Sequence, residues 1–316
     1  MNLQTKIPLK PQQHNQIDYN SSILLLGSCF VENIGKKLDY LKFQTLQNPF
    51  GILFQPLAIE KLIDNAINEK QYTEDDIFFH NEQWHCYDAH SKLSSSLKED
   101  LLNNLNEQIK STNQQINKSK HIIITLGTAW VYRHIETDAF VANCHKVPQK
   151  KFLKELLSID ETIESLQSII ALLRSVNKKA SILFTVSPIR HLKDGFIENT
   201  QSKAHLIAAI HQVVEPRHNL YYFPSYEIMM DELRDYRFYA EDMIHPNQTA
   251  VNYIWEKFKE VWISKEASET INAVDFIKKG LQHRPFNPNS EAHQKFLKNL
   301  EERKILLQKK HSHIVF

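Results

Sequence analysis

Short apolar segments alternate with longer amphipathic segments along this chain. Four short, mostly apolar segments predict buried strands over 23–26, 122–126, 182–186 and 220–223. A fifth candidate strand covers 42–46. Elsewhere apolar residues recur every three or four positions, which predicts helices over 56–68, 97–116, 160–176, 202–214 and 248–262. Strands that alternate with helices predict a parallel sheet covered by helices on both faces.

Two insertions and a tail depart from this alternation. Residues 72–93 and 131–152 contain pairs of short β-like runs and predict β-hairpins, which we expect to form a wall or lid of a cleft. Residues 266–316 carry no strand pattern and predict a helical C-terminal appendage. Residues 1–265 should therefore form one α/β domain with hairpin insertions.

Composition narrows the classes of function. The chain has 316 residues, with 38 basic and 37 acidic side chains and a net charge of +1, so nucleic acid is not an expected partner. It has neither a run of roughly 20 apolar residues that could span a membrane nor an apolar signal core, so we expect a cytoplasmic protein. The three cysteines are widely spaced and predict reduced thiols, with no metal or other cofactor. His80, His85 and His90 recur at an odd spacing that does not converge on a metal in a strand.

Small or polar residues follow three of the predicted strands. They are Gly27-Ser28, Gly127-Thr128 and Ser187-Pro188. Ligands collect at the carboxyl ends of strands in open parallel sheets, so these segments should line one cleft. Ser28 has two interpretations: it caps the following helix, or it is a nucleophile.

The second half of a nucleophilic site is predicted far downstream, at Asp242 and His245. A spacing of three places both side chains on one side of a turn, where a carboxylate can orient an imidazole that acts as base toward a serine. The alternative is that Asp242 and Asn247 only bracket the start of a helix. Cys29 is an alternative nucleophile, and Arg190 with His191 could bind an anionic group of a substrate.

Several sequence blocks resemble the GSCFA family, which belongs to the SGNH (GDSL-like) hydrolase superfamily. The blocks are Gly27-Ser28-Cys29-Phe30, Asn48-Pro49-Phe50-Gly51, Thr125-Leu126-Gly127-Thr128-Ala129-Trp130, Asn143-Cys144-His145-Lys146-Val147-Pro148, Ser187-Pro188-Ile189-Arg190-His191 and Asp242-Met243-Ile244-His245-Pro246. The resemblance implies a three-layer α/β/α sandwich with a flavodoxin-like parallel sheet. It further implies Ser28 as nucleophile, His245 as base and Asp242 as its orienter.

The resemblance also implies an oxyanion hole, in which the backbone N–H groups of Ser28 and Gly51 bind the negative oxygen. The superfamily's third block usually supplies an asparagine as a further donor, but this chain has Ala129 there. Substitutes considered for that donor are Thr128, Asn143, His145 and Arg190. We hypothesise that Asn143 or His145, from the second hairpin, takes this role.

The expected function is that of a serine esterase or acyl hydrolase. Its substrate would be a small acyl ester on a polar scaffold such as a carbohydrate, handled without a cofactor or metal. Two alternatives remain: an acyltransferase that forms the same acyl-enzyme, and a non-catalytic binding or scaffold protein that retains the fold. The C-terminal helices could join copies into a homo-oligomer.

Overall fold

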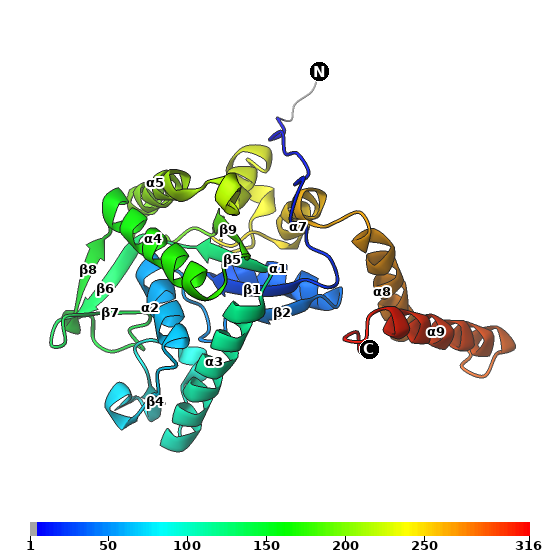
Figure 1. The fold of residues 1–316 in the computed structure, drawn as a ribbon, viewed down its shortest axis with the longest axis horizontal. Helices are drawn as coiled ribbons and strands as arrows, with labels where there is room; N and C mark the ends of the chain where they lie inside the picture. The colour runs from blue at the N-terminus through cyan, green and yellow to red at the C-terminus, as the bar shows by residue number, and fades with distance from the viewer. Residues whose placement is uncertain (1–4) are drawn as a thin grey trace.

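A five-stranded parallel sheet forms the centre of the molecule (Figure 1). The computed structural model describes residues 5–316. The strands of this sheet are β1 (Ser22–Gly27), β2 (Gln44–Gln47), β5 (His121–Leu126), β9 (Ser181–Val186) and β10 (Leu220–Phe223). Their order is β10-β9-β5-β1-β2, and every neighbouring pair is parallel. This is the flavodoxin-like order, so the predicted fold is confirmed.

Helices cover both faces of the sheet. One face carries α2 (Pro56–Ile67), α3 (Lys98–Lys118), α4 (Ile159–Val176) and α5 (Phe196–Val213), and the other carries α1 (Cys29–Tyr40) and α7 (Gln248–Trp262). The short α6 (Ser225–Glu227) follows β10, and α8 (Ala267–Gln282) and α9 (Glu291–Lys310) follow α7. Successive strand residues point to opposite faces, so Leu24 packs with α2 to α5 and Leu25 packs with α1 and α7. The two apolar clusters make the three-layer sandwich.

The strand order places a switch point between β1 and β5. The chain leaves β1 toward β2 on one side and later returns to β5 on the other side. The crossover connections diverge at such a point, which is where open parallel sheets usually bind their ligands. Ser28 follows β1 directly, so it lies at this switch point.

The two insertions form small antiparallel sheets. The first contains β3 (Phe78–His80) and β4 (Gln83–His85). The second contains β6 (Trp130–His134) and β7 (Ala139–Val141), and β8 (Phe152–Leu156) extends it to three strands. The hairpins agree with the predicted pattern, whereas β8 was not predicted.

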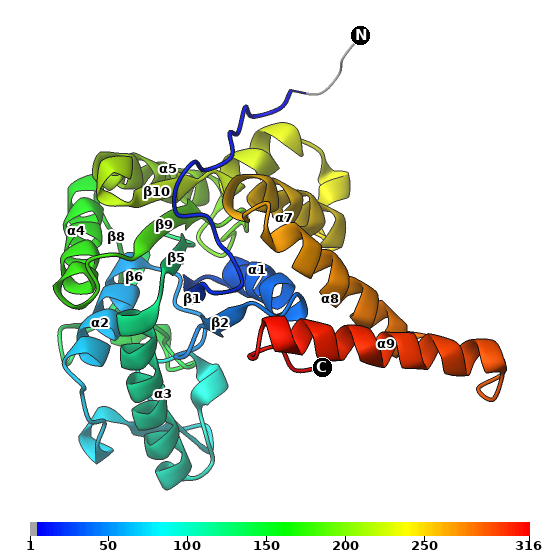
Figure 2. The same ribbon diagram turned by 45° about the vertical axis from the view of Figure 1, so that its right-hand side comes forward.

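Helices α8 and α9 form the predicted helical tail. Val274 and Ile277 of α8, with Leu300 and Leu307 of α9, join the same apolar cluster as α1 and α7. Figure 2 shows that the N-terminal end of α9 extends away from the sheet. Association of two copies through these helices stays a prediction.

Among the residues that the structure describes, no helix is both long enough and apolar enough to cross a membrane.

Candidate active site

Ser28 caps the N-terminus of α1 and is almost completely buried. Its Oγ accepts a hydrogen bond from the N–H of Phe30 at 3.3 Å, and 1% of the residue is exposed. The serine therefore acts as the helix cap in the structure. A cap at the first turn also places its hydroxyl at the positive end of the helix dipole, where a negative charge on oxygen is stabilised.

The segment from Asn48 to Phe54 is fastened to the ends of two strands. The Asn48 side chain accepts from the Gly27 N–H at 2.9 Å, and the Gly27 carbonyl accepts from the Leu53 N–H at 3.1 Å. The Phe54 carbonyl accepts from the Gly127 N–H at 2.7 Å. The second sequence block is thus held between β1 and β5, at the switch point.

Gly27 and Gly51 adopt backbone conformations that require glycine. Gly27 has a φ of 134°, and a Cβ there would lie 2.1 Å from the Thr125 carbonyl oxygen. Gly51 has a φ of 73°, and a Cβ there would lie 2.5 Å from the Cβ of His90. Close packing of the chain against itself therefore explains both glycines without a ligand.

The two backbone donors expected in the oxyanion hole already make hydrogen bonds. The Ser28 N–H donates to the Thr125 carbonyl at 3.0 Å, and the Gly51 N–H donates to the Asn48 carbonyl at 2.8 Å. Binding an oxyanion at either group would exchange one of these bonds. Their assignment as oxyanion donors stays a prediction.

Asp242 and His245 are joined as the spacing predicts. Oδ2 of Asp242 lies 2.6 Å from Nδ1 of His245, and Oδ1 accepts from the N–H groups of Ile244 and His245 at 2.9 and 3.0 Å. The turn is closed by Met243, whose φ is 56°. These backbone and side-chain hydrogen bonds lower the pKa of Asp242 to about 2, so the carboxylate is ionised and orients the ring.

This arrangement leaves Nε2 of His245 for a further partner. A carboxylate accepts, so the proton of the neutral ring belongs on Nδ1 and Nε2 is the basic nitrogen. Ser28 and His245 do not share a hydrogen bond in the structure, which describes both residues. Catalytic hydrogen bonds are often long or absent without substrate, so this separation is compatible with a triad.

Arg190 attaches the Asp242–His245 turn to the segment after β9. Its N–H donates to the Ile244 carbonyl at 3.3 Å, and its guanidinium donates to the Met243 carbonyl at 3.5 Å. The guanidinium also lies 4.1 Å from the centre of the Tyr239 ring. In this arrangement Arg190 supports the turn that carries His245, at the same edge of the sheet as Ser28.

The other substitutes for the missing asparagine differ in their free donors. The Thr128 hydroxyl bonds to Ser202 at 2.8 Å. Nδ1 of His145 bonds to the Ser91 hydroxyl at 3.0 Å and Nε2 to the Cys86 carbonyl at 2.8 Å, which leaves no ring nitrogen free.

Asn143 keeps a free donor where His145 does not. Its Oδ1 accepts from the His145 N–H at 2.8 Å, whereas its amide N–H₂ makes no hydrogen bond in the described part of the chain. Asn143 therefore has a donor to offer, and its role in an oxyanion hole stays a prediction.

The sequence pattern missed Ser202 and Lys203, which lie on the buried side of α5. Both are 1% exposed. Spacing could have found them, because Ser202 and Lys203 lie four and three positions before the buried Leu206 and therefore on the same face of the helix. Both residues are polar, so a search for apolar residues at helical spacing does not detect them.

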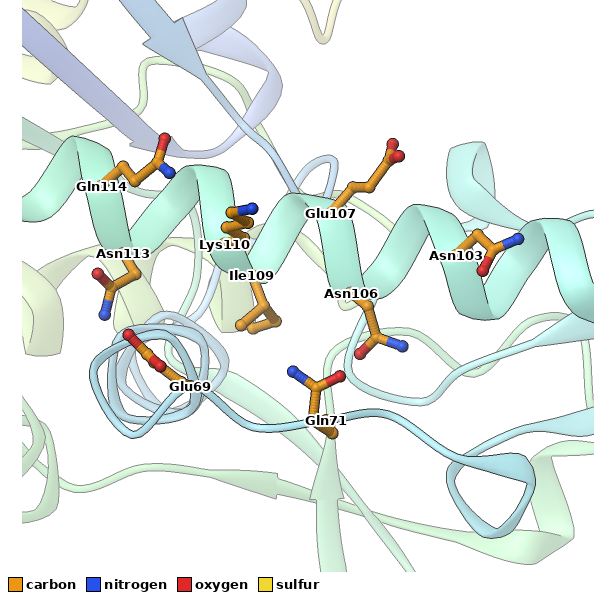
Figure 3. Close-up of a pocket in the computed structure, with 9 residues that line it drawn as sticks. All are labelled: Glu69, Gln71, Asn103, Asn106, Glu107, Ile109, Lys110, Asn113 and Gln114. Atoms are coloured by element: carbon orange, nitrogen blue, oxygen red, sulfur yellow. The ribbon is translucent and has the colours of Figure 1, made fainter.

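A surface hollow of about 530 Å³ lies between α3 and the segment after α2 (Figure 3). Glu69, Gln71 and Lys110 are among its lining residues, which include none of the predicted catalytic residues. Two of its amides are already bonded, because Asn106 pairs with the Tyr72 backbone and Asn113 donates to the Ala66 carbonyl. The hollow is therefore not part of the candidate site.

No group of three His, Cys, Asp or Glu side chains in residues 5–316 is arranged to hold a metal ion. His85 bonds to the Ser94 hydroxyl at 2.6 Å and to the His80 carbonyl at 3.0 Å. Its ring therefore serves the packing of the first hairpin.

The fold and the site together define a class. This is a flavodoxin-like α/β protein with a helix-capping serine at the switch point of its sheet and an Asp–His pair at the same edge. Residues 22–258 match the model of the GSCFA family, and residues 274–316 match the GSCFA domain protein, C-terminal domain. The chain belongs to the GSCFA family. No curated protein matches it.

Proposed function

We propose that this protein is a serine acyl hydrolase of the SGNH (GDSL-like) type, with Ser28 as nucleophile, His245 as base and Asp242 as its orienter. The observation that carries the proposal is the 2.6 Å contact between Asp242 and His245, at the sheet edge where Ser28 caps α1. The ionised carboxylate of Asp242 keeps the ring proton of His245 on Nδ1, so Nε2 can accept a proton.

In the proposed reaction, Nε2 of His245 takes the proton of the Ser28 hydroxyl as its oxygen bonds to the ester carbonyl carbon. The tetrahedral intermediate collapses when the ester C–O bond breaks, and His245 returns the proton to the departing alcohol. Water then attacks the acyl-serine by the same route and releases the acid.

The negative oxygen of the tetrahedral intermediate needs hydrogen-bond donors beside Ser28. The free amide of Asn143 is one candidate, and the N–H of Cys29 is another, because as the first residue of α1 it bonds to no other residue in the described part of the chain. Losing one oxyanion donor costs on the order of 100- to 1000-fold in turnover, so at least one replacement is needed for an efficient enzyme.

The proposal is tested by hydrolysis of short-chain p-nitrophenyl and sugar acetate esters. The wild type should hydrolyse at least one of them, and Ser28→Ala and His245→Ala should each abolish the activity. Ser175→Ala, which removes a hydroxyl on α4 outside the site, is the matched control and should keep full activity. Hydrolysis that survives Ser28→Ala would refute the proposal.

A non-catalytic binding protein is the second candidate. It is favoured by a specific observation: Ser28 is 1% exposed, and both expected oxyanion donors are bonded within the chain. A fluorophosphonate reagent discriminates the two, because it modifies only an activated serine. Absence of both labelling and ester hydrolysis would favour the binding protein.

An acyltransferase would share the acyl-serine and differ only in the acceptor. Adding sugars or amines to the hydrolysis assay distinguishes it, since a transferase diverts the acyl group from free acid to the added acceptor.

A further inference from the structure

Lys203 is a buried lysine that the proposed chemistry does not use. It lies on α5, is 1% exposed, and its Nζ donates to the Gly127 carbonyl at 2.6 Å and the Ser187 carbonyl at 2.7 Å. No carboxylate pairs with it among the described residues. The two carbonyls follow β5 and β9, so one side chain joins the carboxyl ends of two neighbouring strands.

Burial of an amine without a counter-charge is unfavourable, and an apolar residue at this position would avoid that desolvation. Burial lowers the pKa of Lys203 to about 7. Both carbonyl contacts survive loss of the proton, because a neutral amine keeps two N–H groups. The link between the strands is therefore independent of the protonation state.

Ser202 strengthens the same link on the β5 side. Its Oγ accepts from the Ala129 N–H at 2.7 Å and bonds to the Thr128 hydroxyl at 2.8 Å. Consecutive residues of α5 thus hold Gly127 to Ala129, the block in which the superfamily's asparagine is missing.

On the β9 side the link reaches the residues beside the base. The Ser187 side chain accepts from the Ile189 N–H at 3.3 Å, and Arg190 is joined to the Ile244 carbonyl in the turn that carries His245.

His191 follows in the same segment and lies against Gly127. Its Nε2 would be 3.0 Å from a Cβ on Gly127, and this buried nitrogen has no hydrogen-bond partner among the described residues. Burial, with smaller contributions from nearby Lys203 and His245, lowers the pKa of His191 to about 3. Lys203, His191 and the base therefore occupy one neighbourhood.

We infer that Lys203 is a positioning residue of the candidate active site, which sets the spacing between the segments after β5 and β9 and thereby the place of the Asp242–His245 turn. This inference rests on the proposed function for its effect on turnover. Its structural part, the link between the two segments, is separate from that function.

The test compares Lys203→Met, which keeps the length of the side chain without its donors, with Lys203→Arg, which restores donors. Thr112→Val is the matched control, because Thr112 is fully buried on α3 and donates to the Gln108 carbonyl. Two quantities are measured: kcat and KM for the best short ester, and amide hydrogen exchange of peptides covering 127–131, 187–191 and 240–247.

Lys203→Met should lower kcat about 10- to 100-fold with KM nearly unchanged, because a base displaced by about 1 Å slows the chemical step more than binding. Exchange should become faster in the three peptides and not elsewhere. Lys203→Arg should recover part of the loss, and Thr112→Val should change neither quantity in these peptides.

An unchanged kcat in Lys203→Met, or faster exchange spread evenly over the chain, would overturn the inference. If the wild type shows no hydrolysis, the proposed function fails and exchange alone decides: a rise confined to the three peptides supports the link, and no rise overturns it. If Lys203→Met does not fold, Ser202→Ala replaces it, with faster exchange of 127–131 expected and unchanged exchange as the contrary result.

Discussion

Replacing Asp242 by asparagine should disable the base while leaving the turn folded. The amide oxygen can still accept from the N–H groups of Ile244 and His245, as Oδ1 does now at 2.9 and 3.0 Å. The amide nitrogen, however, would face Nδ1 of His245 across the present 2.6 Å contact, where two donors cannot bond. The ring would move its proton to Nε2 and could no longer accept from Ser28.

The expected loss of activity in Asp242→Asn depends on how exposed Asp242 and His245 are to solvent. In a buried Ser-His-Asp triad the same change lowers kcat by about 10⁴-fold. The Asp242 side chain is 45% exposed, so water competes for the ring and a smaller loss, about 10²- to 10³-fold, is expected.

The assay is the rate of fluorophosphonate labelling, followed together with thermal unfolding. Asp231→Asn is the matched control, since Asp231 is an exposed partner of Arg234 on a nearby segment. Labelling of Asp242→Asn within threefold of the wild-type rate, in a folded protein, would refute the orienting role of Asp242.

Three further predictions concern stability and the identity of the nucleophile. Burial lowers the pKa of His145 to about 4, so between pH 6.5 and 4 the unfolded chain binds a proton at this residue that the folded chain does not. This difference should lower the free energy of unfolding by about 3 kcal/mol between pH 7 and 4. Urea unfolding measured over this pH range should show a weaker pH dependence in His145→Gln. Gly27→Ala would place a Cβ 2.1 Å from the Thr125 carbonyl oxygen at a φ of 134°, and should cost more than about 2 kcal/mol in urea unfolding; a loss under about 0.5 kcal/mol would contradict this strain. Burial raises the pKa of the Cys29 thiol, so Cys29→Ala should keep fluorophosphonate labelling at Ser28 within threefold, whereas its loss would point to the cysteine.

The middle of the central sheet was predictable because β1, β5 and β9 are almost completely buried on both faces. Short continuous apolar runs such as Ile122 to Leu126 are typical of strands in a covered parallel sheet, and the structure has β5 there. Strand β8 escaped prediction because only Phe152 in it is buried, while Lys154 and Glu155 interrupt the apolar pattern. Helix α5 begins six residues before the predicted start at 202, because its first turn exposes Phe196 and buries polar Asn199.

In the candidate site, contacts between residues close in sequence could be predicted, whereas contacts between distant residues could not. The contact between Asp242 and His245 lies within one turn, so a spacing of three residues was enough to predict it. The contacts of Lys203 join residues 76 and 16 positions away, and no local pattern encodes them. The bonds that occupy the N–H groups of Ser28 and Gly51 likewise depend on how the segments pack.

The most direct test of the central claim is the site of covalent modification by a fluorophosphonate, located by mass spectrometry of the digested protein. The account predicts one adduct, on Ser28, that is absent in His245→Ala. An adduct on another residue, or an adduct on Ser28 that forms equally well in His245→Ala, would contradict it.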